Sequence, residues 1–138
     1  MMRNIFISLM LLAASVFAEQ GWLRSYEEGK TQALQENKLV LVMLSKEGCD
    51  ACWYMENIVF EDSAVDTVLK KNFVPVYLDI HQDSVPEQFK YIGTPAFYFT
   101  DAQGKKIGHV LNGASNVKDF MSRINTVLDE AKRLDLNL

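Results

Sequence analysis

Residues 39–53 read Leu39-Val-Leu-Val-Met-Leu-Ser45, then Lys46-Glu-Gly48, then Cys49-Asp-Ala-Cys52-Trp53. A run of mostly apolar residues with two valines is typical of a strand that is buried on both faces of a parallel or mixed sheet. Gly48 ends this run, and a helical pattern begins at Cys49. The sequence therefore predicts a Cys-x-x-Cys pair at the junction between a buried strand and a helix.

This position suits the two cysteines to thiol–disulfide exchange. The first turn of a helix has free backbone N–H groups and a positive dipole end, which favour a thiolate over a thiol. Two sulfurs three residues apart can close a disulfide with little backbone movement, so one cysteine can attack while the other resolves. Cys49 and Cys52 are the only cysteines, and a structural bridge over so short a loop would constrain the unfolded chain little. Redox chemistry is the leading interpretation.

Length and charge limit the other function classes. A chain of 138 residues fits one domain with a sizeable core. The formal net charge of −4 offers no basic patch for a nucleic acid. We expect a monomer that uses no bound cofactor beyond its own cysteine pair.

The N-terminal segment has the layout of a secretory signal peptide. Arg3 supplies a short positive region, residues 5–17 are mostly apolar, and Val16-Phe-Ala18 fits a cleavage site. The predicted division is a signal peptide at 1–18 and one domain at 19–138, although retention of the segment as an anchor stays open. Export points to the bacterial periplasm, an oxidising compartment in which a reduced pair needs a thiol donor.

The rest of the chain predicts alternating helices and strands. Residues 26–37 form a first helix capped by Ser25, and residues 73–80 form a second strand that is parallel to the first. Pro75 cannot donate a hydrogen bond to a neighbouring strand, so this strand is expected at the sheet edge.

The last third of the chain predicts a hairpin and a helix. Residues 96–99 form an aromatic strand, and residues 106–111 form the second arm of the hairpin. Apolar residues from Val117 to Ala131 recur at helical spacing, with Ser115 or Asn116 as the cap.

Together these features resemble the thioredoxin fold, an α/β fold with a central mixed four-stranded sheet flanked by helices. The resemblance rests on the cysteine pair, the parallel crossover and Gly93-Thr-Pro95 before the hairpin. It extends over residues 26–133. Gly48-Cys-Asp-Ala-Cys52 and Phe60-Glu-Asp-Ser-Ala-Val65 are most similar to secreted proteins of the SoxW type and to the C-terminal domain of the reductant carrier DsbD.

The resemblance implies a role for several residues. Cys49 would be the nucleophile and Cys52 the resolving thiol. Pro95 would be cis beside the sulfurs, and Thr94 would offer its backbone to an extended substrate. Gly113 would let a partner chain approach the same face. The implied substrates are cysteine-containing exported proteins, with a membrane or periplasmic thiol as the electron donor.

Three departures from the family pattern affect this site. Gly48 replaces a tryptophan that faces substrates, and Ala51 replaces a proline between the cysteines. Met43 replaces a buried aspartate that accepts the proton of the resolving thiol. Glu47 and Glu56 are the nearby carboxylates, and we expect each to be a solvated charge.

The surroundings of the pair suggest a reducing role. Asp50 and Glu47 place negative charge near Cys49, which disfavours its thiolate and biases the pair modestly towards donating electrons. Trp53 is expected to be partly exposed and to contact substrates, whereas Tyr54 and the aromatic strand are expected in the core.

Two other functions stay open on the sequence alone. Structural zinc wants four ligands, and neither His81 nor His109 has ligand spacing to the cysteines. Copper(I) could bind the two thiolates, so a copper-handling protein is one alternative. The other is a thioredoxin-like binding module without redox activity.

Overall fold

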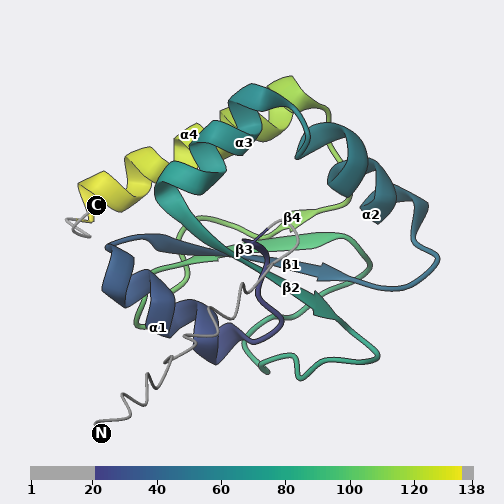
Figure 1. The fold of residues 1–138 in the computed structure, drawn as a ribbon, viewed down its shortest axis with the longest axis horizontal. Helices are drawn as coiled ribbons and strands as arrows, with labels where there is room; N and C mark the ends of the chain where they lie inside the picture. The colour runs from purple at the N-terminus through teal and green to yellow at the C-terminus, as the bar shows by residue number, and fades with distance from the viewer. Residues whose placement is uncertain (1–20, 135–138) are drawn as a thin grey trace, which may run out of the picture.

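The computed structural model describes residues 21–134 and contains one four-stranded mixed sheet between two layers of helices (Figure 1). The predicted signal peptide lies outside these residues. The strands are β1 (Leu39–Ser45), β2 (Phe73–Asp79), β3 (Ala96–Thr100) and β4 (Leu111–Asn112). The helices are α1 (Tyr26–Glu36), α2 (Asp50–Tyr54), the π-helix η2 (Met55–Val59), α3 (Ser63–Asn72) and α4 (Val117–Arg133). Within the described range, no helix is long and apolar enough to cross a membrane.

Strand β1 lies inside the sheet, as its composition predicts. The strand order is β2-β1-β3-β4, and β1 is parallel to β2 and antiparallel to β3. All seven β1 residues are buried. Because successive side chains alternate between the two faces of a strand, β1 contributes to two separate cores.

The first core contains Leu39, Leu41 and Met43 and packs under the helices that follow β1 in the chain. In it, the Phe97 ring contacts Phe120 with ring centroids 5.5 Å apart. The second core contains the alternate residues Val40, Val42 and Leu44, together with α1 residues Tyr26 and Ala33. In Figure 1, α1 covers this second face alone, while α3 and α4 cover the first.

Strand β2 forms an edge of the sheet, as Pro75 predicts. The segment before α1 caps this edge: Leu23 N–H donates to Pro75 O at 2.9 Å, and Tyr77 N–H donates to Leu23 O at 2.8 Å. Further along, Asp79 N–H donates to a carboxylate oxygen of Asp83 at 2.7 Å. The donors along this edge are therefore occupied, which protects it from pairing with another strand.

The predicted hairpin is only partly formed. Instead of a continuous arm over residues 106–111, the chain makes one isolated bridge between Lys106 and Thr100, and β4 contains only two residues. Gly108 has a positive φ of 67°. A left-handed residue leaves the extended conformation, so the chain departs from β3 before it returns as β4.

The starts of α1 and α4 follow predicted caps, and α3 also has a side-chain cap. Ser25 Oγ accepts from Glu28 N–H at 3.3 Å and begins α1, and Asp62 accepts from two N–H groups to begin α3. Asn116, rather than Ser115, caps α4 by accepting from Asp119 N–H at 2.9 Å. The cap at Asp62 separates α3 from η2, so the helical segment that begins at the cysteines ends before α3 starts.

Candidate active site

The cysteine pair lies where the sequence predicts, at the end of β1 and the start of α2. Gly48 takes a positive φ of 72° and turns the chain out of the loop that follows the strand. Cys49 is the N-cap of α2, and its Sγ accepts a hydrogen bond from Cys52 N–H at 3.2 Å. A donor aimed at this sulfur favours its charged form after reduction.

The two sulfurs form a disulfide, and the two cysteines differ in exposure. Their Cα atoms are 5.2 Å apart. Cys49 is half-buried, whereas Cys52 is only 2% exposed and belongs to the first core. As predicted, Cys49 is thus the cysteine that another molecule can reach.

The loop before β3 brings Thr94 and Pro95 beside Cys49. The Thr94 hydroxyl donates to Cys49 Sγ at 3.3 Å, and Thr94 O lies 3.5 Å from the same sulfur. The Thr94–Pro95 peptide bond is cis, and Pro95 is buried. Gly113 joins the site from β4, because its N–H donates to Pro95 O at 2.8 Å.

Gly113 leaves open space next to this loop. It is exposed, has a positive φ of 86°, and a Cβ built on it would meet nothing within 4 Å. Four of the predicted site residues, Cys49, Thr94, Pro95 and Gly113, are thus linked by these contacts. Gly48 and Trp53 flank the cysteine pair in the chain, and both are exposed.

Glu56 lines a cleft of about 460 Å³ together with Met43, Arg24 and Tyr77. Met43 is fully buried in the same core as Cys52. Glu47 is exposed, as expected, but Glu56 is half-buried, and burial raises the pKa of its carboxyl group. The expectation of a solvated charge was therefore wrong for Glu56, which is placed one helical turn after Cys52.

Large apolar side chains are exposed close to the site. Of the seven in the described range, five lie within six residues after Cys52 or within three residues before Thr94 in the chain: Trp53, Tyr54, Ile58, Tyr91 and Ile92. Trp53 is 59% exposed, as expected, but the expectation of a core position for Tyr54 was wrong. A single helix can turn only one stripe inward, and here Cys52, Met55 and Val59 form it.

Ile92 is the functional candidate that sequence reasoning missed. It is 92% exposed and lies two residues before Thr94. The available signal was a pair of large apolar residues, Tyr91-Ile92, in a loop directly before Gly93-Thr-Pro95.

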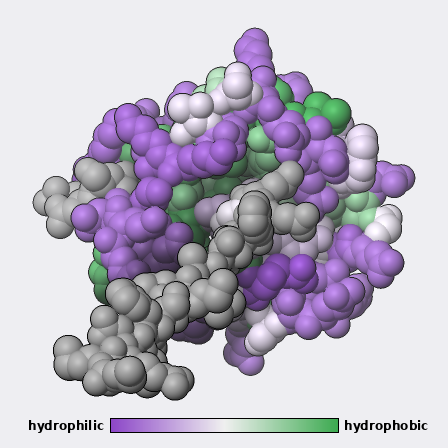
Figure 2. Space-filling model, viewed as in Figure 1, coloured by the Kyte–Doolittle hydropathy of each residue, from purple (hydrophilic) through white to green (hydrophobic). Residues whose placement is uncertain are grey.

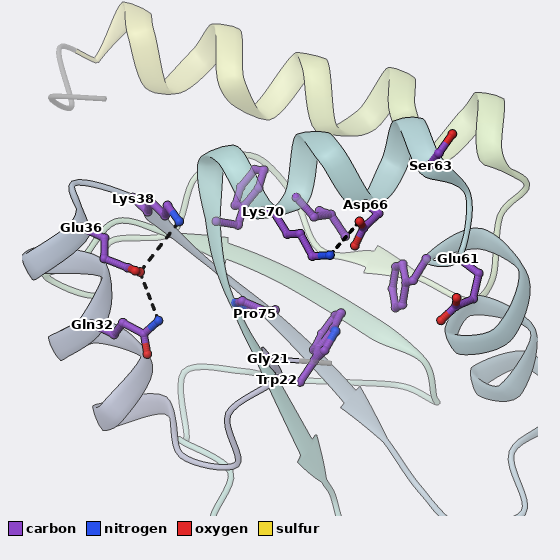
Figure 3. A pocket seen from close by; sticks show the side chains of 13 residues that line it. Gly21, Trp22, Gln32, Glu36, Lys38, Glu61, Ser63, Asp66, Lys70 and Pro75 are labelled. Atoms are coloured by element: carbon purple, nitrogen blue, oxygen red, sulfur yellow. Dashed lines mark hydrogen bonds and ion pairs between the residues drawn. The ribbon is translucent and has the colours of Figure 1, made fainter. Parts of the chain in front are cut away.

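A larger groove lies elsewhere, and neither cysteine nor histidine lines it. It encloses about 650 Å³ between α1, α3 and the edge of β2 (Figure 3). Its charged residues pair locally: Lys70 Nζ lies 2.8 Å from Asp66, and Lys38 Nζ lies 3.9 Å from Glu36. We assign the chemistry to the disulfide instead. Among residues 21–134, no three His, Cys, Asp or Glu side chains are grouped to hold a metal ion.

The sequence model of a family described as thioredoxin-like matches residues 21–102. The chain belongs to the thioredoxin-like family. Among curated relatives, the thiol:disulfide interchange protein DsbD of Pseudoalteromonas atlantica is 29% identical over 112 residues, which cover 77% of this chain and 19% of that protein.

Solved structures agree on the fold. A thioredoxin from Thermus thermophilus has a TM-score of 0.65 and 23% identity, covering 78% of this chain and 86% of that one. The oxidised DsbD C-terminal domain of Neisseria meningitidis has a TM-score of 0.59 and 14% identity, covering 75% and 97%. This thioredoxin-like protein therefore has the predicted thioredoxin fold and, with its Cys-x-x-Cys disulfide, is a thiol–disulfide oxidoreductase.

Proposed function

We propose that this thioredoxin-like protein reduces disulfides of exported proteins in the bacterial periplasm, with Cys49 as the nucleophile and Cys52 as the resolving thiol. The observation that carries this proposal is the asymmetry of the pair. Cys49 is half-buried and accepts two hydrogen bonds at its sulfur, whereas Cys52 is buried behind it. The apolar segment at residues 5–17 supports export.

The proposed cycle transfers two electrons from the protein to its client. The Cys49 thiolate attacks one sulfur of the client disulfide, and the other client sulfur leaves as a thiolate that takes up a proton. The Cys52 thiolate then attacks Cys49 Sγ, which releases the second client thiol and closes the Cys49–Cys52 disulfide. A membrane or periplasmic thiol protein must then reduce this disulfide, and no bound cofactor takes part.

The surroundings of Cys49 suggest how a client would bind. The backbone of Thr94 lies beside the sulfur and can pair with an extended client segment in the manner of an added strand. Gly113 leaves room for that segment on the other side of Pro95. Gly48 and Trp53 directly flank the cysteine pair in the chain and are exposed, so a client that reaches Cys49 can contact them.

The direction of electron flow depends on how strongly the Cys49 thiolate is stabilised. Two local effects on this thiolate oppose each other, so neither gives it the strong stabilisation that marks an oxidase. Asp50 and Glu47 disfavour a thiolate on Cys49, while the two hydrogen-bond donors favour it. Both carboxylates are exposed and therefore screened. We expect a reduction potential of about −230 to −270 mV, whereas a value of about −120 mV would mark an oxidase instead.

Reduction of insulin by dithiothreitol tests this proposal directly. The protein should accelerate the reaction, and equilibration with glutathione should give a potential in the reducing range. A Cys52→Ala variant should accumulate mixed disulfides with exported proteins in cells. An inactive protein that instead binds copper(I) stoichiometrically in its reduced form would contradict the proposal.

A further inference from the structure

Ser45 carries a polar group that the fold buries without a hydrogen bond. It is the last residue of β1, and it is fully buried. Polar side chains cover most of the surface in Figure 2, whereas Ser45 lies wholly inside. Among residues 21–134, its Oγ is the one buried side-chain nitrogen or oxygen atom that has no hydrogen-bond partner. An unpaired buried hydroxyl group destabilises a fold, so its presence here calls for an explanation.

The Ser45 side chain lies on the side of the sheet that carries the cysteine pair. The odd-numbered residues of β1, from Leu39 to Met43, belong to the first core, and the even-numbered ones belong to the second. Because side chains alternate along a strand, Ser45 faces the first core. Cys52 belongs to the same core, and a short loop leads from the end of β1 into the helix that bears it (Figure 1).

The polar side chain next to Ser45 on the sheet is already occupied. Asp79 is the neighbour of Ser45 in the register between β1 and β2. Its Oδ1 accepts hydrogen bonds from the N–H groups of His81 at 2.8 Å and Gln82 at 3.1 Å. This carboxylate therefore closes the loop after β2 and does not use the Ser45 hydroxyl.

The two cysteine sulfurs differ in their hydrogen bonds as well as in their exposure. Cys49 Sγ accepts from the Thr94 hydroxyl and from the Cys52 N–H. Within the part of the chain that the structure describes, no hydrogen bond reaches Cys52 Sγ, although Cys52 is the more deeply buried. A thiolate in apolar surroundings is disfavoured unless a donor stabilises it. The resolving sulfur therefore needs a donor, and the same core holds a hydroxyl group without a partner.

We propose that the Ser45 hydroxyl donates a hydrogen bond to the Cys52 thiolate once the disulfide has opened, which makes Ser45 a positioning residue for the resolving step. This inference rests on the proposed function. In the mixed disulfide, Cys52 is no longer bonded to Cys49, so its side chain can turn to another rotamer. Cys52 gives its proton to water, and its thiolate attacks Cys49 Sγ. The bond between Cys49 and the client sulfur breaks, and that sulfur leaves as a thiolate.

The test follows both chemical steps in one reaction. The reduced protein reacts with an excess of dithiobis(nitrobenzoate), an aromatic disulfide that yields a coloured thiolate. Attack by Cys49 releases the first coloured thiolate, and attack by Cys52 on the mixed disulfide releases the second. Stopped-flow absorbance records both releases across a range of pH in the parent, Ser45→Ala, Ser45→Thr and Ser45→Val.

Removing the hydroxyl should affect the second release only. Ser45→Ala should keep the first release within about twofold of the parent, because Cys49 retains both of its donors. The second release should be about threefold slower at neutral pH, and the midpoint of its pH dependence should rise by about one unit. Above both midpoints, Ser45→Ala should be as fast as the parent or faster, because the less stabilised thiolate is the better nucleophile.

Two further comparisons separate the hydroxyl from the shape of the side chain. Ser45→Thr should give a faster second release than Ser45→Val, which has the same shape without the hydroxyl. Thr100→Val is the control on the other face, since Thr100 is also fully buried but hydrogen-bonds to Tyr26. This control should lower the urea midpoint and leave both releases unchanged. The urea midpoint of oxidised Ser45→Ala should stay the same or rise, because the hydroxyl that it loses has no partner.

The ionisable groups around Cys52 are common to the parent and the Ser45 variants, so they cancel in the comparison. No residue of β1 is ionisable, and the ionisable residue of β3, Tyr98, belongs to the second core. No charged residue of α3 or α4 is buried. The remaining groups, on the segment of the pair, on β2 and in the cleft, are Lys46, Glu47, Cys49, Asp50, Tyr54, Glu56, Tyr77, Asp79 and Arg24.

Three results would overturn the inference: an unchanged pH midpoint in Ser45→Ala, equal second releases in folded Ser45→Thr and Ser45→Val, or a lower urea midpoint of oxidised Ser45→Ala. The last result would show that the hydroxyl already serves the fold of the oxidised protein. A parent that releases only one thiolate, or none, would instead contradict the proposed function. Circular dichroism checks folding, and Ser45→Ala decides alone if the larger side chains do not fit.

Discussion

Both faces of the sheet are covered by buried apolar residues, but the groups at the margin of each core differ. On the α1 side, polar groups are closed within the protein: the Tyr26 hydroxyl hydrogen-bonds to Thr100 Oγ1 at 2.9 Å, and Gln88 donates to it at 3.3 Å. On the opposite side, the core ends at a disulfide whose outer sulfur contacts the exposed loop at Thr94. Strand β1 separates the two, so the protein can be reactive on one face while the other maintains the fold.

The difference extends to the molecular surface. Trp53, Tyr54 and Ile58 follow Cys52 in the chain and are exposed, as is Ile92 just before Thr94. On α1, by contrast, Leu34 is the one large apolar side chain that is exposed within the described range. The comparison teaches that burial alone does not identify the functional side of this molecule. Exposed apolar residues beside a half-buried cysteine do.

The largest expected effect comes from removing the outer sulfur on the reactive side. Cys49→Ser should lower the rate of insulin reduction by about a thousandfold or more, because no thiolate remains to attack. Its free energy of unfolding should fall by only about 2 kcal/mol, since the disulfide closes a loop of only three residues' separation. Insulin turbidity and urea unfolding measure the two quantities.

Cys52→Ala is the matched control for this experiment. It should retain the attack by Cys49 and stop at the mixed disulfide, which mass spectrometry would detect. If Cys52→Ala abolished the first attack and Cys49→Ser did not, the assigned roles would be reversed.

The second-largest effect is expected from crowding the core on the α1 side of the sheet. A Cβ added to Gly29 on α1 would lie 2.4 Å from Val76 Cγ2, so Gly29→Ala should lower the free energy of unfolding by about 1–3 kcal/mol. Insulin reduction by the folded variant should be unchanged. Urea unfolding provides the measurement, and Val76→Ala added to Gly29→Ala should restore part of the loss by making room for the methyl group.

Sequence reasoning predicted the features that depend on local chemistry. The buried strand, the helix that begins at Cys49, the edge position of Pro75 and the caps all follow from side-chain alternation, proline geometry and side-chain oxygens. The family resemblance pointed to Thr94 and Gly113, which are far from the cysteines in sequence. The structure brings them to Cys49 and Pro95.

The errors concern features that depend on how elements pack. Tyr54 was expected in the core, but the stripe that faces the core passes through Met55 and Val59. The carboxyl group of Glu56 is partly shielded because η2 places it in the cleft, which no local pattern shows. The hairpin arm fails because Gly108 turns the chain away from β3.

A smaller effect tests how tightly the α1 side is closed. Tyr26→Phe removes the buried hydroxyl group and should lower the free energy of unfolding by about 0.5–1.5 kcal/mol. Thr100 Oγ1 keeps its bond to Asp101 O at 2.9 Å, so the variant leaves no unpaired donor there. Urea unfolding at neutral pH measures this loss, and an unchanged midpoint would show that the hydroxyl contributes nothing to the closure.

The smallest effect concerns Glu56, whose carboxyl group is partly buried on the reactive side. Burial raises the pKa of Glu56, so the folded protein retains its proton at pH values where the unfolded chain has lost it. The free energy of unfolding contributed by Glu56 therefore falls as pH rises from the ordinary glutamate pKa through the raised one. Glu56→Gln cannot titrate, so its stability relative to the parent should increase across this window and then level off. The gain should be less than about 1 kcal/mol, because solvent in the cleft screens the carboxylate. Urea unfolding of both proteins on each side of the window isolates this group, since their other carboxyl groups are shared. A difference that shrinks as pH rises would show that the folded protein favours the ionised carboxylate.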